Sequence, residues 1–135
     1  MAIVRQEIEI DARPEDVWDA VRDFANVHER VVPGFLTALE MDGYDRIVTF
    51  ANGVVARERL VGIDDEARRI AYAVISEQLT HHSASIEILA RDERRTRFVW
   101  ITDVLPDEAA SSIAPMMAMG AEAAKRTLEA SAVGA

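Results

Sequence analysis

The chain has 135 residues, of which 50% are hydrophobic, and a formal net charge of -9. This length suits one domain with its own core, and the acidic balance argues against a nucleic-acid partner and against docking on anionic membranes. The absence of cysteine excludes disulfides, thiolate metal sites and a cysteine nucleophile. Because the N-terminus lacks a signal-peptide pattern and no apolar stretch reaches membrane-spanning length, we expect a cytoplasmic protein without membrane insertion.

The first elements are a strand and two short helices. Residues 3–11 alternate between apolar and charged side chains, which is typical of a half-buried strand. A proline and acidic residues in 11–16 suit the first turn of a helix. The apolar residues that then recur at helical spacing are Val17, Trp18, Val21 and Phe24. Residues 26–32 favour a second short helix, which Pro33 and Gly34 end.

From residue 35 to residue 104 the hydrophobic period is two, which predicts further strands. Turn signals divide this segment at residues 42–43, 52–53, 64–66 and 91–93, and Asn-Gly at 52–53 is the strongest hairpin signal among them. The predicted strands are 35–41, 46–51, 54–63, 68–75, 81–90 and 95–104.

The last element is one long amphipathic helix that begins after Pro106, with Pro115 in its first two turns. Its apolar or small face comprises Ile113, Met117, Gly120, Ala124, Leu128 and Ser131. The small residues in its middle permit either close packing on the sheet or a cavity beside it.

A sheet with one apolar face needs a cover, and only the long helix is large enough to provide it. The sequence therefore predicts an α+β fold, in which a seven-stranded curved antiparallel sheet wraps around a long C-terminal helix, with two short helices after the first strand. We assign residues 1–130 to a single domain and residues 131–135 to a frayed tail.

Alternation along each strand also predicts which side chains face the helix. Arg57 and Arg59 share a face that should point to solvent, which leaves Glu58 on the buried side. The same alternation places inside the residues Tyr72, His82, Ile86, Phe98, Trp100 and Thr102. A few polar groups in an apolar concavity describe a small-molecule pocket. For Glu58 alone, a position near a strand end in contact with water explains the pattern equally well.

The order of elements and several sequence strings resemble the SRPBCC superfamily, also called START-like or helix-grip proteins, and within it the bacterial polyketide cyclase/dehydrase-like branch. The strings lie at residues 12–18, 57–66 and 99–102. The resemblance implies a ligand cavity between the sheet and the last helix. In the plant abscisic-acid receptors of this superfamily, a glutamate in a similar Glu-Arg-Leu string faces the cavity, and Glu58 corresponds to it. The loop at residues 51–53 corresponds to their cavity gate, but it is shorter and lacks the gate sequence.

We therefore expect the protein to bind a small hydrophobic ligand, similar to a polyketide, a lipid or an aromatic compound, in an internal cavity. The expected ligand-binding residues are Glu58, Tyr72, His82, Trp100, Thr102, Phe98, Ile86, Met117 and Gly120. Since Glu58 is an inward polar group, Glu58→Gln is expected to change ligand affinity or turnover with little loss of folding.

Two other functions stay open. One is an enzyme of the cyclase, dehydratase or lyase type, with Glu58 and His82 moving a proton and Tyr72 donating to the developing enolate. The other is a dimeric accessory protein with a non-functional cavity. Glu58 and His82 within reach of one point would favour the enzyme. An apolar pocket with the two groups apart would favour binding, and a filled core would favour the accessory role.

No metal site and no cofactor are expected. His81 and His82 are adjacent in a predicted strand, so their side chains point to opposite faces and cannot enter the same pocket. The sequence contains no glycine-rich phosphate loop and no nucleophile-elbow string.

A homodimer interface is one interpretation of the strands around residues 52–53. If these two residues alone form the turn, Phe50 pairs with Val55 beside Val48, on the face opposite to Glu58. That outer apolar cluster would be a candidate dimer interface. A longer loop would shift the register by one residue and move the cluster to the other face.

Overall fold

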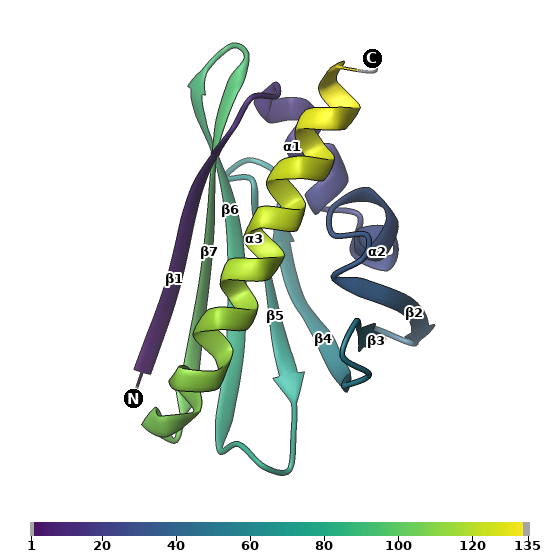
Figure 1. The fold of residues 1–135 in the computed structure, drawn as a ribbon, viewed down its shortest axis with the longest axis vertical. Coiled ribbons are helices and arrows are strands. Elements are labelled where there is room, and N and C mark those ends of the chain that lie inside the picture. The colour runs from purple at the N-terminus through teal and green to yellow at the C-terminus, as the bar shows by residue number, and fades with distance from the viewer. Residues whose placement is uncertain (1, 134–135) are drawn as a thin grey trace.

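A computed structural model describes residues 2–133, and their strands and helices follow the predicted order (Figure 1). The first part comprises β1 (Ala2–Ile10), α1 (Pro14–Val21), the 3-10 turn η1 (Phe24–Asn26) and α2 (Val27–Arg30). The middle part comprises the strands β2 (Leu36–Asp42), β3 (Asp45–Phe50), β4 (Val55–Asp64), β5 (Arg69–Ile75), β6 (His81–Asp92) and β7 (Arg95–Leu105). The last part comprises η2 (Asp107–Ala109) and α3 (Ala110–Val133).

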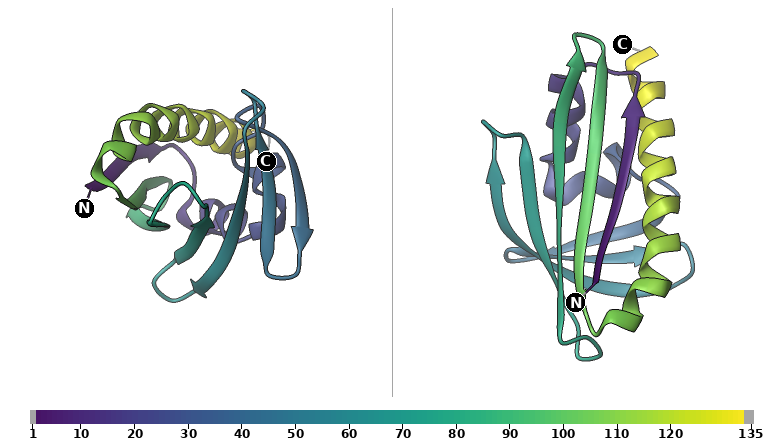
Figure 2. Two further views of the ribbon diagram at one scale, coloured as in Figure 1. Left: turned by 90° about the horizontal axis from the view of Figure 1, so that it is seen from below. Right: turned by 90° about the vertical axis from the view of Figure 1, so that its left-hand side faces the viewer.

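The strands of residues 2–133 form one seven-stranded sheet with the order β1-β7-β6-β5-β4-β3-β2, and every neighbouring pair is antiparallel. The sheet curves, and α3 lies along its concave side (Figure 2). The predicted helix-grip α+β fold, with two short helices after the first strand, is confirmed. No helix among the described residues is long and apolar enough to cross a lipid bilayer.

The first helix forms for the reasons that its sequence suggests. Pro14 stands at its start, and its buried side includes Val17, Trp18 and Val21. Proline suits this position because the first helical N–H groups have no partner within the helix. The indole Nε1 of Trp18 donates a hydrogen bond of 3.0 Å to Asp65, so α1 is tied to the turn between β4 and β5.

The long helix lies close to the sheet at Gly120. A Cβ atom at this position would lie 2.9 Å from a ring carbon of Trp100 and 3.0 Å from a ring carbon of Phe35. Such distances are well inside van der Waals contact, so only glycine lets α3 lie this close to the sheet. The predicted buried face is otherwise confirmed except at its end, where Ser131 is exposed. The helix continues to Val133, and residues 134–135 of the predicted tail lie outside the described residues.

The loop between β3 and β4 decides the register of both strands. The backbone N–H of Phe50 bonds to the carbonyl of Val54 at 2.8 Å, and that of Gly53 bonds back to Phe50 at 2.9 Å. The loop therefore has three residues, and Gly53 adopts the left-handed conformation that such a loop needs, with φ of 89°. Val48 is fully buried and Phe50 faces the concave side. Of the three residues of the expected cluster, Val55 is the exposed one. The prediction of an apolar group of Phe50, Val55 and Val48 on the outer face is therefore wrong, so these residues do not form the expected dimer interface.

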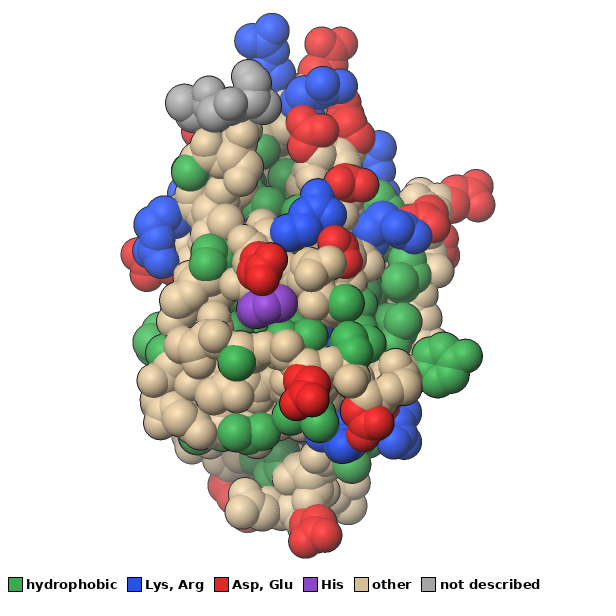
Figure 3. All heavy atoms as spheres, turned by 90° about the vertical axis from the view of Figure 1, so that its right-hand side faces the viewer, with side chains coloured by type: hydrophobic (Ala, Val, Ile, Leu, Met, Phe, Trp, Pro, Cys, Tyr) green, Lys and Arg blue, Asp and Glu red, His purple; other side chains and the backbone are tan. Residues whose placement is uncertain are grey.

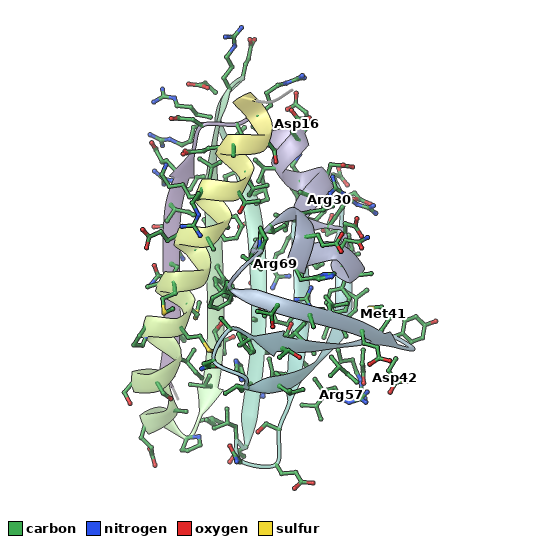
Figure 4. All side chains as sticks on the ribbon, turned by 45° about the vertical axis from the view of Figure 1, so that its right-hand side comes forward. Asp16, Arg30, Met41, Asp42, Arg57 and Arg69 are labelled. Carbon is green, nitrogen blue, oxygen red and sulfur yellow. The ribbon has the colours of Figure 1, made fainter. Side chains whose placement is uncertain are left out.

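The convex side of β3 and β4 carries a cluster of charged side chains. As predicted, Arg57 and Arg59 point outward, and both donate to Asp45 at distances of 2.7 to 3.0 Å. Arg57 also donates to Asp42 at 2.9 Å, where the two side chains lie beside each other at the edge of the sheet (Figure 4). The hydrogen bonds from Arg59 and Arg57 lower the pKa of Asp45 from 3.8 to about 2. We refer to Asp42, Asp45, Arg57 and Arg59 as the outer cluster.

Candidate functional site

A cavity of about 160 Å³ lies between the concave face of the sheet and the first half of α3. Its wall is mainly hydrophobic and is built by α2, by strands β2 to β7 and by α3. All of the residues predicted to bind a ligand lie on this wall, namely Glu58, Tyr72, His82, Trp100, Thr102, Phe98, Ile86, Met117 and Gly120. Alternation had placed the strand residues on one face and helical spacing had placed Met117 and Gly120 on another, and the curvature of the sheet brings them around one space (Figure 2). Their role in binding stays a prediction.

The polar centre of the wall is an ion pair that sequence analysis missed. Arg46 and Glu58 lie directly opposite each other on β3 and β4, and Nε of Arg46 donates to Oε1 of Glu58 at 2.8 Å. Both side chains are buried, with exposed fractions of 7% and 11%. Glu58 is therefore not at a water-exposed strand end. We call Arg46 and Glu58 the inner pair.

Aromatic rings hold the guanidinium group of Arg46 in place. Its carbon lies 3.9 Å from the centre of the Phe24 ring and 5.0 Å from the centre of the Tyr72 ring. At these distances the ring faces attract a cation. Nη1 of Arg46 also donates to the backbone carbonyl of Phe24 at 3.0 Å. The inner pair is thus fixed from both sides before any ligand arrives.

Arg46 was missed because its orientation depends on the β3–β4 loop. Arg46, Val48 and Phe50 alternate in phase, so they all face the same side of β3. The interpretation with a two-residue turn put this side outward. The third loop residue reverses it, which turns Arg46 toward Glu58 and brings Phe50 into the cavity wall. The signal that could have found Arg46 was its alternation with Val48 and Phe50. Whether these three side chains face inward or outward, however, depended on the length of the loop.

Next to the inner pair, Tyr72 and Trp100 are joined across the cavity wall. Nε1 of Trp100 donates to the hydroxyl oxygen of Tyr72 at 3.1 Å. Burial raises the pKa of Tyr72, and the negative charge of Glu58 raises it further, so the hydroxyl group stays protonated at neutral pH. No described residue accepts a hydrogen bond from this hydroxyl group, which leaves its proton available to a molecule in the cavity.

His82 lies at the start of β6, apart from the inner pair. Burial lowers its pKa, and the neighbouring His81 lowers it further, so its imidazole ring is neutral at pH 7. His81 is exposed and contacts Ser83, so the two histidines face opposite sides as predicted. Strand β5 separates His82 from Glu58, which places their backbones roughly 10 Å apart across the sheet. Within residues 2–133 no hydrogen bond joins the two side chains.

The cavity reaches the surface beside the β3–β4 loop. Val54 lines the cavity and is nevertheless 52% exposed, which marks this residue as part of the rim. Met116 of α3 also lines the cavity and is half-buried. On the side of the molecule that carries β2 and β3, hydrophobic side chains gather below a belt of charged ones (Figure 3). The exposed side chain of Val54 marks the place where the cavity opens.

The titratable side chains of the described part of the chain do not gather into a metal site. No group of three or more His, Asp or Glu side chains within residues 2–133 is arranged to hold a metal ion. The arrangement in the cavity instead suits recognition of an organic molecule, with hydrogen-bonding groups from Arg46, Glu58 and Tyr72 on one side of an apolar space.

Comparison with known proteins identifies a family for nearly the whole chain. Residues 1–133 match the family described as polyketide cyclase / dehydrase and lipid transport. No curated protein matches the chain closely enough to count as a relative.

Solved structures with the same fold include proteins of unassigned and of known activity. An uncharacterised protein from Bacillus thuringiensis superimposes with a TM-score of 0.83 at 18% identity, over 94% of this chain and 98% of that one. A protein from Thermobifida fusca is 30% identical over 96% of this chain and 91% of that one, with a TM-score of 0.74. The Zhui aromatase/cyclase from Streptomyces sp. R1128 has a TM-score of 0.72 at 18% identity, over 98% and 93% of the two chains.

Proposed function

Since the chain belongs to the polyketide cyclase/dehydrase and lipid transport family, we propose that it binds a small hydrophobic ligand in the cavity between its sheet and α3. One observation carries the proposal, namely a mainly apolar cavity of about 160 Å³ with a few polar side chains on its wall. Pockets for small molecules combine an apolar wall with a few placed polar groups in this way. The ligand would contact the residues predicted from the sequence and, in addition, Arg46.

The volume of the cavity narrows the choice among polyketide, lipid and aromatic ligands. An apolar protein cavity of about 150 Å³ accommodates one benzene molecule. The present cavity, of about 160 Å³, therefore suits a single ring or a short chain. A multi-ring polyketide or a long lipid would require the wall to move outward, so we propose a ligand of about one ring.

A catalytic role for Glu58, His82 and Tyr72 has less support. Glu58 is engaged by Arg46, and no hydrogen bond among the described residues joins it to His82. Acid–base catalysis needs hydrogen-bond contact with the reacting group, and the carboxylate of Glu58 already accepts a bond from Arg46. The acid–base hypothesis stays a prediction, and the engagement of Glu58 by Arg46 favours binding.

The accessory role also has less support, because the space between sheet and helix is open rather than filled. Homodimer formation stays a prediction without an assigned interface, since the residues proposed for it do not form an outer cluster.

Native mass spectrometry of protein purified from its own host tests the proposal. We expect a retained small molecule that Ala56→Leu displaces, because Ala56 lines the cavity and the larger side chain would fill it. Ala73→Leu is the matched control, since it adds the same volume on the opposite face of the neighbouring strand. Calorimetry with toluene serves as a second measurement. If no small molecule is retained and toluene does not bind, the proposal is contradicted.

A further inference from the structure

The inner pair has hydrogen-bonding groups that the protein itself does not use. Nε and Nη1 of Arg46 donate to Glu58 and to the carbonyl of Phe24. Among residues 2–133, no side chain or backbone group accepts from Nη2 of Arg46, and none donates to Oε2 of Glu58. Both residues line the cavity, and the pair leaves one donor and one acceptor unused.

These unused groups are not sealed away from the cavity. In the described part of the chain, the buried side-chain atom without a partner is Nδ1 of His28, and no atom of the inner pair shares that condition. The free atoms of Arg46 and Glu58 therefore keep some accessible surface, and both residues line the cavity.

The charges around the cavity also balance. Arg46 and Glu58 contribute one positive and one negative charge, while Tyr72 and His82 are neutral at pH 7. An ionised ligand would bring an uncompensated charge into an apolar space, which is strongly unfavourable. A carboxylate would also meet the carboxylate of Glu58, and an ammonium group would meet the guanidinium of Arg46.

Resting on the proposed function, we propose that the ligand is a neutral molecule of about one ring whose hydroxyl group binds the inner pair. A hydroxyl group accepts from Nη2 of Arg46 and donates to Oε2 of Glu58, so it uses both free groups at once. A carbonyl group can only accept a hydrogen bond, so it would use Nη2 of Arg46 but not Oε2 of Glu58. A hydrocarbon would use neither group. The inner pair thus selects an alcohol or a phenol over an acid, an amine or a hydrocarbon of equal size.

Four probes with the same ring and different end groups test the inference by calorimetry at pH 7: 4-methylphenol, toluene, benzoate and benzylamine. We expect 4-methylphenol to bind about tenfold more tightly than toluene, because hydrogen bonds to charged groups are the stronger ones. Benzoate and benzylamine should bind more weakly than toluene. Equal affinity for toluene and 4-methylphenol, or tightest binding of an ionised probe, would overturn the inference and leave the proposed function standing. If none of the four probes binds, both the inference and the proposed function are overturned.

A double variant isolates the contribution of the inner pair. Arg46→Met with Glu58→Leu keeps the wall apolar and should bind toluene while losing the tenfold preference for 4-methylphenol. The control is Arg5→Met with Glu7→Leu, which removes an exposed Arg–Glu pair from β1 and should keep the preference. Persistence of the preference in the folded inner-pair variant would contradict the inference. The wild-type comparison of probes decides the question by itself if that variant does not fold.

Discussion

Two groups of opposite charges lie on opposite faces of the same two strands. The outer cluster uses Asp45, Arg57 and Arg59, while the inner pair uses their immediate neighbours Arg46 and Glu58. In the outer cluster Asp45 accepts from both arginines, whose side chains are 36% and 55% exposed. In the inner pair a single hydrogen bond joins two side chains that are nearly sealed from bulk water. The same residue types therefore act under different dielectric conditions.

The comparison teaches that the exposure of the arginines, rather than charge pairing, decides what an ion pair does. Asp45 is itself only 6% exposed, but the guanidinium groups that bind it are in contact with water, so water and salt weaken each pair of the outer cluster. The inner pair loses hydration when the protein folds, and replacing a buried pair by apolar residues of similar size is often neutral for stability. Retaining such a pair at the wall of a cavity is consistent with a role in recognition.

The largest expected effect is the loss of one partner of the inner pair. Arg46→Met leaves the carboxylate of Glu58 buried without its cation and should lower the free energy of unfolding by about 3 kcal/mol. Urea denaturation would measure this loss, and the double variant with Glu58→Leu should recover most of it. Equal stability of the single and double variants would mean that the pair is not desolvated. Glu58→Gln would likewise leave the buried cation of Arg46 without its anion. We therefore now expect this variant to lose stability, in place of the small effect on folding expected from the sequence.

A second way to probe the inner face is the close contact between Gly120 and the aromatic rings beside it. Alanine is a better helix former than glycine by about 1 kcal/mol, so Gly120→Ala would stabilise an open helix position. Here the new methyl group meets rigid rings of Trp100 and Phe35, and overpacking costs roughly 1 to 3 kcal/mol. We therefore expect a net loss of stability by thermal denaturation. A rise in the melting temperature would show that α3 has room to move.

The outer cluster should make the stability of the protein depend on pH below about pH 4. The folded pKa of Asp45, about 2, lies below its ordinary value of 3.8. The unfolded chain therefore binds a proton first as the pH falls, and stability that is present above about pH 4 is lost as the pH falls toward 2. Urea midpoints measured from pH 5 to pH 2 should fall less steeply for Asp45→Asn than for the wild type. Identical slopes would contradict the assignment.

The smallest expected effect is the loss of one exposed arginine. Arg57→Gln removes the bonds to Asp42 and Asp45, but Arg59 still holds Asp45. The loss of stability should be far smaller than for Arg46→Met and should shrink further in high salt, because exposed pairs are screened. Denaturation at low and at high salt would measure both effects. A loss as large as that of Arg46→Met would remove the distinction between the two faces.

Side-chain alternation alone identified the part of the cavity wall that β4 to β7 contribute. Successive side chains on a strand point to opposite faces, so the outward arginines at 57 and 59 were enough to turn Glu58 inward, and the same rule applied to Tyr72 and Trp100. The fold followed in the same way, because an apolar sheet face requires a cover and the chain offers one long helix. Both conclusions rest on local periodicity.

Only the tertiary structure decided what those residues do together. The orientation of Arg46 depended on one extra residue in the loop at 51–53, which no period within β3 reveals. The bond from Trp100 to Tyr72 joins β7 to β5 across the intervening strand β6. The sequence by itself determined which side chains face the cavity from β4 to β7, since that depends on the backbone pleat. The pairing of Glu58 with Arg46, and with it the balance of charge in the cavity, came from the packing of strands onto one another.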